Sequence, residues 1–225
     1  MSSFKIRTDL ALEARENMDD AAEECRGVSV EEEYDQKSEI RITRVVIETK
    51  NGAKAMGKPI GTYITLEAPA MALPDEDYHQ EIAGELARQL RRIIPGLEGE
   101  QSVMVVGLGN RDVTADALGP NVVDNLIITR HMVKEYGKAA YNQNRIHMIS
   151  GLIPGVMAKT GMESQEIIKG VVEQTKPDVV VVIDALAARS TKRLNRTIQV
   201  TNTGIHPGSG VGNNRNAITK EALGV

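Results

Sequence analysis

Two aspartates follow apolar runs of the chain inside the same tripeptide, Asp-Ala-Leu. Asp116 lies in VGLGNRDVTADALGP (106–120), and Asp184 lies in VVVVIDALAAR (179–189). If both runs are parallel strands of one sheet, both carboxylates lie beyond the carboxyl ends of those strands, where open α/β sheets place their active sites. Paired carboxylates in a cleft can share a proton and activate water. The pattern therefore predicts a hydrolytic site built on Asp116 and Asp184.

A histidine offers a second interpretation of the same pair. His206 stands in the loop TGIHPG (203–208), which we expect at the same edge of the sheet. Aspartate and histidine are zinc ligands, so Asp116, Asp184 and His206 could together hold a divalent metal such as zinc. With two acids and one loop histidine we favour a site without a metal or other cofactor, and the metal site stays open as the alternative.

A glycine pair after the first apolar run raises a third possibility, nucleotide binding. Gly107 and Gly109 could begin a dinucleotide-binding loop, but the third glycine of that fingerprint falls on Asp112. An acid at this position would repel a pyrophosphate. A non-catalytic nucleotide-binding module is therefore the weaker alternative.

The composition narrows the class of protein. The 225 residues are 41% hydrophobic and 26% charged, with a net charge of −4 and one cysteine, Cys25. This composition is ordinary for a soluble globular protein, and the absence of a basic excess argues against direct binding to nucleic acid. A single thiol cannot form an internal disulfide, which favours a reducing compartment. The sequence shows neither a signal peptide nor a membrane-spanning stretch, so we expect no membrane partner and a cytoplasmic protein.

The first half of the chain contains few clear elements. Residues 1–37 are predicted to be a polar leader that includes a first helix at about 9–26. Two runs rich in Ile, Val and Thr, 39–50 and 58–68, predict a β-hairpin whose turn is Asn51-Gly52. A helix is then expected up to Pro95-Gly96, since its apolar residues recur at helical spacing.

Strands and helices alternate in the second half. We predict strands at 102–107, 145–150, 178–183 and 197–201, a helix over about 120–136, and a helix that ends near 175 and begins at a capping box of Thr160 and Glu163. This alternation predicts an α/β fold with a mixed, largely parallel sheet and helices on both faces. Residues 38–225 are predicted to form a single α/β domain with the β-hairpin as an appendage.

Several long segments resemble the germination protease of spore-forming bacteria. The resemblance covers nearly the whole chain and rests on the following segments: RTDLALEA (7–14), GTYITLEAPA (61–70), VGLGNRDVTADALGP (106–120), GLIPGVMAKTGMES (151–164), VIDALAARS (182–190) and TGIHPGSGVGN (203–213). It implies an endopeptidase, related in fold to the hydrogenase-maturation peptidases, with Asp116 and Asp184 as a catalytic aspartate dyad. It also implies a homotetramer in the spore core that degrades small acid-soluble, DNA-coating spore proteins during germination.

The resemblance also implies a zymogen that cleaves itself near its N-terminus. The family cuts its substrates after Glu within a sequence of the type Thr/Ser-Glu-Phe/Ile-Ala, and residues 8–11 of this chain read Thr-Asp-Leu-Ala. The pro-segment would therefore be cut between Asp9 and Leu10. Arg189 and His206 are candidate supporting residues, Arg189 because a cation near the cleft would attract the acid before the cut bond. The family also implies a further C-terminal region, which would follow Val225.

Overall fold

The computed structural model describes residues 8–16, 27–97, 99–137, 146–208 and 215–225. The chain forms two compact units. The first unit comprises Met1–Pro95, Leu186–Thr203 and Ser209–Gly212, and the second comprises Gly96–Ala185, Gly204–Gly208 and Asn213–Val225. Within the described residues, no helix is long and apolar enough to cross a membrane.

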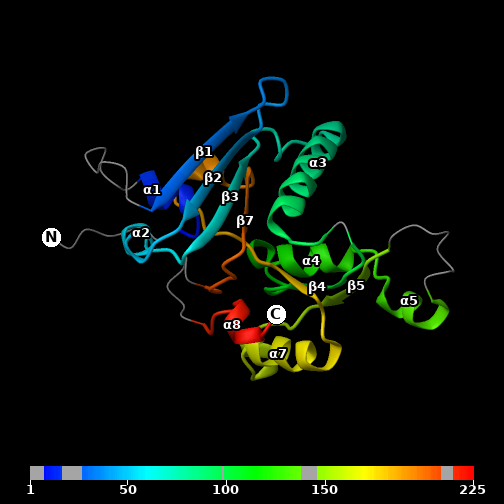
Figure 1. The fold of residues 1–225 in the computed structure, drawn as a ribbon. Coiled ribbons are helices and arrows are strands. Elements are labelled where there is room, and N and C mark those ends of the chain that lie inside the picture. The colour runs from blue at the N-terminus through cyan, green and yellow to red at the C-terminus, as the bar shows by residue number, and fades with distance from the viewer. Residues whose placement is uncertain (1–7, 17–26, 98, 138–145, 209–214) are drawn as a thin grey trace. The chain divides into compact units, whose positions relative to one another are not determined.

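The first unit is built on an antiparallel sheet with the strand order β1-β2-β3-β7 (Figure 1). Its strands are β1 (Val28–Tyr34), β2 (Arg41–Ile47), β3 (Gly61–Glu67) and β7 (Thr197–Thr201). Because side chains alternate between the two faces of a strand, β2 and β3 each contribute to a core on both faces of the sheet. Strand β7 comes from far along the chain and pairs with β3.

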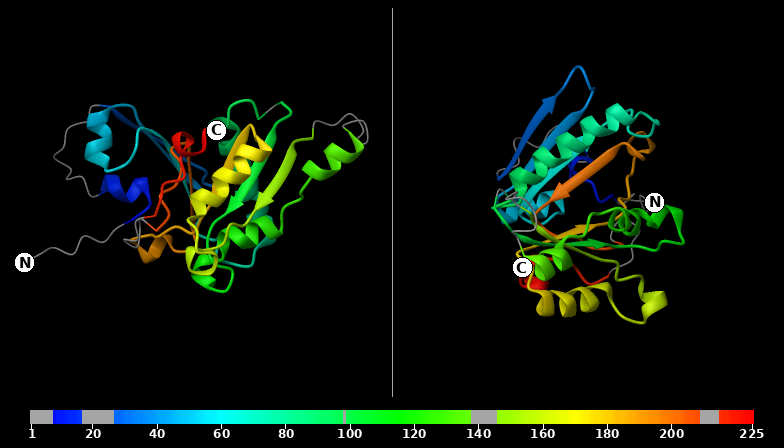
Figure 2. Two further views of the ribbon diagram at one scale, coloured as in Figure 1. Left: turned by 90° about the horizontal axis from the view of Figure 1, so that it is seen from below. Right: turned by 90° about the vertical axis from the view of Figure 1, so that its right-hand side faces the viewer.

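Helices cover both faces of this sheet (Figure 1 and Figure 2). On one face, Ile42, Ile64 and Leu66 pack against Ile82 of α3 (Glu76–Ile93). The opposite face packs against α1 (Ala11–Glu16) and α2 (Lys50–Met56), and its core contains the following buried residues: Ala11, Val45, Ile47, Met56 and Tyr63. Helix α1 therefore contributes Ala11 to the core of the first unit.

The predicted hairpin is confirmed in its pairing but wrong in its turn. Strands β2 and β3 pair antiparallel, but the segment that holds Asn51-Gly52 is helix α2. Thr49 caps this helix by accepting a hydrogen bond from the Gly52 N–H, and Gly57 ends it in the left-handed conformation. These two caps stabilise a short helix where the Asn-Gly pair alone favours a turn.

Strand β1 lies inside the predicted leader and was not anticipated. It pairs along its whole length with β2, although its last four residues are exposed. The acidic run Glu31–Glu33 hides the strand pattern, because these side chains face solvent on an edge strand. Of the helix predicted at about 9–26, only residues 9–16 are described, and α1 occupies Ala11–Glu16; the rest lies outside the described residues.

The second unit is built on a parallel sheet with the order β5-β4-β6. The strands are β4 (Ser102–Gly107), β5 (Met148–Leu152) and β6 (Val179–Ile183), and β4 is buried along its whole length. Met104 and Val106 pack against Ile168 and Val172 of α7 (Ser164–Thr175). Helix α4 (Leu118–Asp124) packs against β4, and α5 (Arg130–Tyr136) packs against β5.

Two helix boundaries in this unit differ from the predictions. The helix expected over about 120–136 is divided into α4 and α5, and the N–H of Thr129 between them bonds to the Ile149 carbonyl of β5. The capping box consists of Glu163 and Glu166 in place of Thr160 and Glu163, because Thr160 ends the short helix α6 (Met157–Thr160). The predicted α/β class, with a parallel sheet and flanking helices, is confirmed.

Candidate functional site

Asp116 and Asp184 both belong to the second unit and follow its neighbouring strands β4 and β6. The last register pair of these strands is Gly107 with Ile183, and Asp184 is the next residue after it. Asp116 is reached through the loop after β4 and ends a short 3₁₀ turn, Thr114–Asp116. Both carboxylates are therefore at the carboxyl-end edge of the same parallel sheet, as the sequence predicts.

Backbone hydrogen bonds hold each carboxylate in place. The N–H of Asn110 donates to Asp116 Oδ2 at 2.8 Å, and the N–H of Ala185 donates to Asp184 Oδ1 at 2.9 Å. Leu108 N–H donates to the Ile183 carbonyl at 2.8 Å, which joins the end of β4 to the residue directly before Asp184. Both aspartates are partly buried, so each can retain contact with water.

Glycines make the close packing at this edge possible. Gly109 has a φ of +114°, and a Cβ at this position would lie 2.0 Å from the backbone oxygen of Asp116. A Cβ on Gly119 would lie 2.3 Å from the Leu108 oxygen and 2.7 Å from the Ile183 oxygen. The glycines therefore serve the fold of the aspartate loop. Asp112, which breaks the dinucleotide fingerprint, is exposed and forms an ion pair with Lys159.

The other candidate residues are placed differently. His206 belongs to the second unit but is exposed, after the isolated bridge between Ile205 and Ile218. The structure does not gather Asp116, Asp184 and His206 into a three-ligand group, nor does it gather any other such group among the described residues. Arg189 belongs to the first unit. The glycine-rich loop at 209–214 lies outside the described residues.

The predicted cleavage segment lies in the first unit and contacts the stretch after Asp184. Asp9 N–H donates to the Ala187 carbonyl at 3.1 Å, and Ala187 N–H donates to Asp9 Oδ2 at 3.1 Å. An aspartate just before a helix often caps it by accepting a hydrogen bond from the first turn. Here the Asp9 side chain instead accepts a hydrogen bond from the Ala187 N–H. Leu10 is fully buried.

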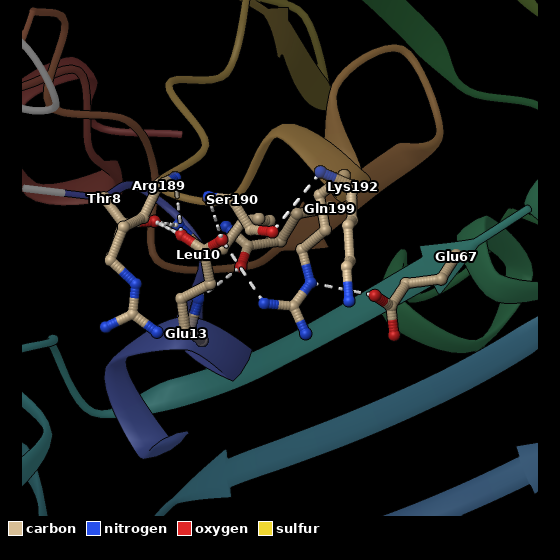
Figure 3. Close-up of polar contacts among 10 residues, drawn as sticks. Thr8, Leu10, Glu13, Glu67, Arg189, Ser190, Lys192 and Gln199 are labelled. Carbon is tan, nitrogen blue, oxygen red and sulfur yellow. Dashed lines mark hydrogen bonds and ion pairs between the residues drawn. The ribbon is translucent and has the colours of Figure 1, made fainter. Parts of the chain in front are cut away.

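Glu13, an acid of residues 8–16, is bonded to four other residues (Figure 3). Its side chain is fully buried and accepts hydrogen bonds from the N–H groups of Arg189, at 2.8 Å, and Ser190, at 3.0 Å. Thr8 Oγ1 also donates to it, and Arg193 contacts it at 3.3 Å. Arg193 in turn bonds Glu67 of β3 at 2.8 Å.

These contacts decide the charge state of Glu13. Burial alone raises the pKa of a carboxyl group, because it penalises the charged form. Hydrogen bonds from Thr8, from the backbones of Arg189 and Ser190, and from Arg193 outweigh burial and lower the pKa of Glu13 below its ordinary value. Glu13 is therefore a charged, buried anchor between residues 8–16 and the segment after Asp184.

Comparison with known proteins decides the family. The family model described as germination protease matches residues 6–225, which is nearly the whole chain. The chain belongs to the germination protease family. A germination protease of Caldanaerobacter subterraneus subsp. tengcongensis is 51% identical over 220 residues, which cover 98% of this chain and 66% of the relative.

Relatives from other genera agree. Germination proteases of Bacillus mycoides and a Geobacillus species are both 41% identical over 100% of this chain, and the matches cover 61% and 62% of those relatives. The chain thus spans just under two thirds of the length of the germination proteases it matches. The family resemblance that the sequence motifs indicate is confirmed.

Sequence reasoning missed the residues that hold the predicted cleavage segment. Lys58 and Gln199 bond to Asp9, Glu13 bonds to Thr8, and Arg193 bonds to Glu13, but none of these four was predicted from the sequence to have a role. Glu13 occupies a helical position where glutamate is common, and its partners lie 176 and 177 residues further along the chain. Only the pairing of β7 with β3 brings Gln199 to this place.

Proposed function

We propose that this chain carries the catalytic part of a spore germination protease, an endopeptidase that uses Asp116 and Asp184. The observation that carries the proposal is the match to the germination protease family over residues 6–225, with both aspartates at one sheet edge. One carboxylate takes a proton from water as it attacks the peptide carbonyl, and the other, protonated, supplies a proton to the leaving amine.

The proposed substrates are the small acid-soluble proteins that coat spore DNA. The test is to incubate purified chain with one such protein and to identify the new termini by mass spectrometry. We expect cuts after an acidic residue preceded by serine or threonine. Absence of cleavage, or cuts without an acid before the bond, would contradict the proposed substrate class.

We further propose that the protein is a zymogen cut between Asp9 and Leu10 and that it acts as a homotetramer in the spore core. The similarity of Thr8-Asp9-Leu10-Ala11 to the family's recognition sequence supports the cleavage site. After incubation of the chain, N-terminal sequencing should give a product that begins with Leu10. Light scattering on the same sample should give the mass of four chains.

The metal-dependent mechanism is the second candidate, and the chemistry of Asp116, Asp184 and His206 is what favours it. A chelator separates the two mechanisms. The aspartate dyad predicts that cleavage of the spore protein continues at an unchanged rate in the presence of the chelator. Strong inhibition that added zinc reverses would establish the metallopeptidase instead.

A further inference from the structure

The peptide bond between Asp9 and Leu10 is bonded at both of its polar atoms. The Asp9 carbonyl oxygen accepts hydrogen bonds from Lys58 Nζ at 2.8 Å and from Gln199 Nε2 at 3.2 Å. On the other side of the bond, the Leu10 N–H donates to Thr8 Oγ1 at 3.1 Å. Lys58 is thus a cationic donor on the carbonyl oxygen of the predicted cleavage bond.

Gln199 is oriented for this contact by a second hydrogen bond. Its Oε1 accepts from the Ala11 N–H at 2.8 Å, which turns Nε2 towards the Asp9 carbonyl. The side chain thus brackets the segment from Asp9 to Ala11, and Figure 3 shows it beside Leu10. Gln199 lies in the middle of β7, opposite Thr65 of β3, so its backbone is fixed by the sheet.

Lys58 is positioned by the end of helix α2. Gly57 closes this helix in the left-handed conformation, and the Lys58 N–H bonds to the Ala53 carbonyl at 3.2 Å. The lysine is partly buried. Burial lowers its pKa, and the nearby charge of Asp9 acts in the opposite direction. Both donors therefore extend from ordered elements towards one oxygen atom.

We propose that Lys58 and Gln199 are catalytic residues of pro-segment cleavage, which stabilise the oxyanion formed at Asp9. This inference rests on the proposed self-cleavage between Asp9 and Leu10. Preorganised donors near 3 Å from a developing oxyanion are a recurring means of stabilising the transition state of acyl transfer. A cationic donor gains most, since the oxygen becomes negative only in the transition state.

The reaction balances without any further reactant. Water adds to the Asp9 carbonyl carbon and gives one proton to the general base of the peptidase. The carbonyl electron pair moves to the Asp9 oxygen, which becomes negative between Lys58 and Gln199. When the intermediate collapses, the bond from carbon to the Leu10 nitrogen breaks and the nitrogen takes up the proton. The second proton of the water stays on the added oxygen, so the products are a carboxyl group at Asp9 and an amine at Leu10.

The experiment compares the processing rates of the full chain and three variants by mass spectrometry. We expect Lys58→Met to slow the appearance of the Leu10 terminus about 100-fold, the usual effect of losing one oxyanion donor. Gln199→Met should slow it independently. Lys54→Met removes an exposed lysine from helix α2 and is the matched control, for which we expect an unchanged rate.

Two further measurements separate catalysis from docking. Hydrogen exchange at the Ala187 amide reports whether Asp9 is still docked, and it should stay protected in Lys58→Met. Lys58→Arg should restore part of the processing rate. The pH above which this rate falls should also be higher in Lys58→Arg, since arginine stays charged where lysine loses its proton.

The outcomes are distinct. No Leu10 terminus from the unaltered chain would overturn the proposed self-cleavage and this inference with it. A normal Leu10 product with an unchanged rate in Lys58→Met would overturn the inference alone. Slow processing accompanied by loss of Ala187 protection would show that Lys58 only docks the segment, and would also overturn it.

Discussion

Asp9 and Ala187 exchange two hydrogen bonds of 3.1 Å, one through their backbones and one through the Asp9 carboxylate. These residues are 178 positions apart, and Ala187 is the third residue after Asp184. The acid of the proposed cleavage site is thus recognised by a backbone N–H in the stretch that follows a proposed catalytic aspartate. The Ala187 N–H donates to the Asp9 carboxylate, and the charge of Lys58 is also near it.

Glu13 should be a major source of stability in the first unit. Replacement by Gln keeps its shape but removes the charge that Arg189 N–H, Ser190 N–H and Arg193 bind. Since hydrogen bonds to charged groups are worth about 1.5–3 kcal/mol, we expect Glu13→Gln to lower the free energy of unfolding by about 2–3 kcal/mol. Urea unfolding measures this. Glu32→Gln, at an exposed position of β1, is the control and should change stability by less than about 0.5 kcal/mol.

Acid should weaken the same anchor. A carboxylate with a lowered pKa stabilises the folded state above its unfolded pKa of about 4.3, and this contribution disappears as the pH falls through the folded-state pKa. The pKa of Glu13 is lowered in the folded chain. The stability difference between the unaltered chain and Glu13→Gln should therefore be constant near neutral pH and shrink below pH 4.3 or so. A difference that grows in acid would contradict the assigned charge state.

The glycine beside Asp116 should not tolerate a side chain. In Gly109→Ala the new Cβ would meet the Asp116 oxygen at 2.0 Å, at a φ of +114° that alanine avoids. We expect a loss of about 3 kcal/mol in unfolding free energy and loss of peptidase activity, because the aspartate loop must move. Gly170→Ala is the matched control in helix α7, where a Cβ meets nothing within 4 Å. It should stabilise the protein by about 0.5–1 kcal/mol.

The sequence predicts best where local pattern and final structure agree. Apolar runs at 102–107 and 197–201 are strands β4 and β7 with the predicted bounds. Strand β7 nevertheless joins the antiparallel sheet of the first unit, because pairing depends on distant partners that a local pattern does not contain. Local propensity gave the wrong element at β1, which is rich in acidic residues, and at the Asn-Gly pair of α2. Tertiary pairing overrides local propensity in the first case, and helix caps override it in the second.

One part of the candidate site could likewise be predicted from the sequence, and another part could not. Asp116 and Asp184 were predicted together because strand ends can be located from apolar runs, and the structure places both at one edge of the sheet. The contacts of Asp9 could not be predicted, because Lys58, Ala187 and Gln199 come from three distant segments. Ala187 lies within VIDALAARS (182–190), but Lys58 and Gln199 belong to none of the segments that carry the family resemblance.

The most direct test of the proposed function is the rate of spore-protein cleavage by Asp116→Asn and Asp184→Asn. Each change is nearly isosteric and removes a proton acceptor, so each variant should fold normally and lose at least about 1,000-fold in activity. Asp124→Asn is the control, because Asp124 is exposed on the same unit and bonds only to Arg111 among its described contacts. It should retain full activity. Cleavage near the normal rate by either Asp116→Asn or Asp184→Asn would contradict the aspartate dyad.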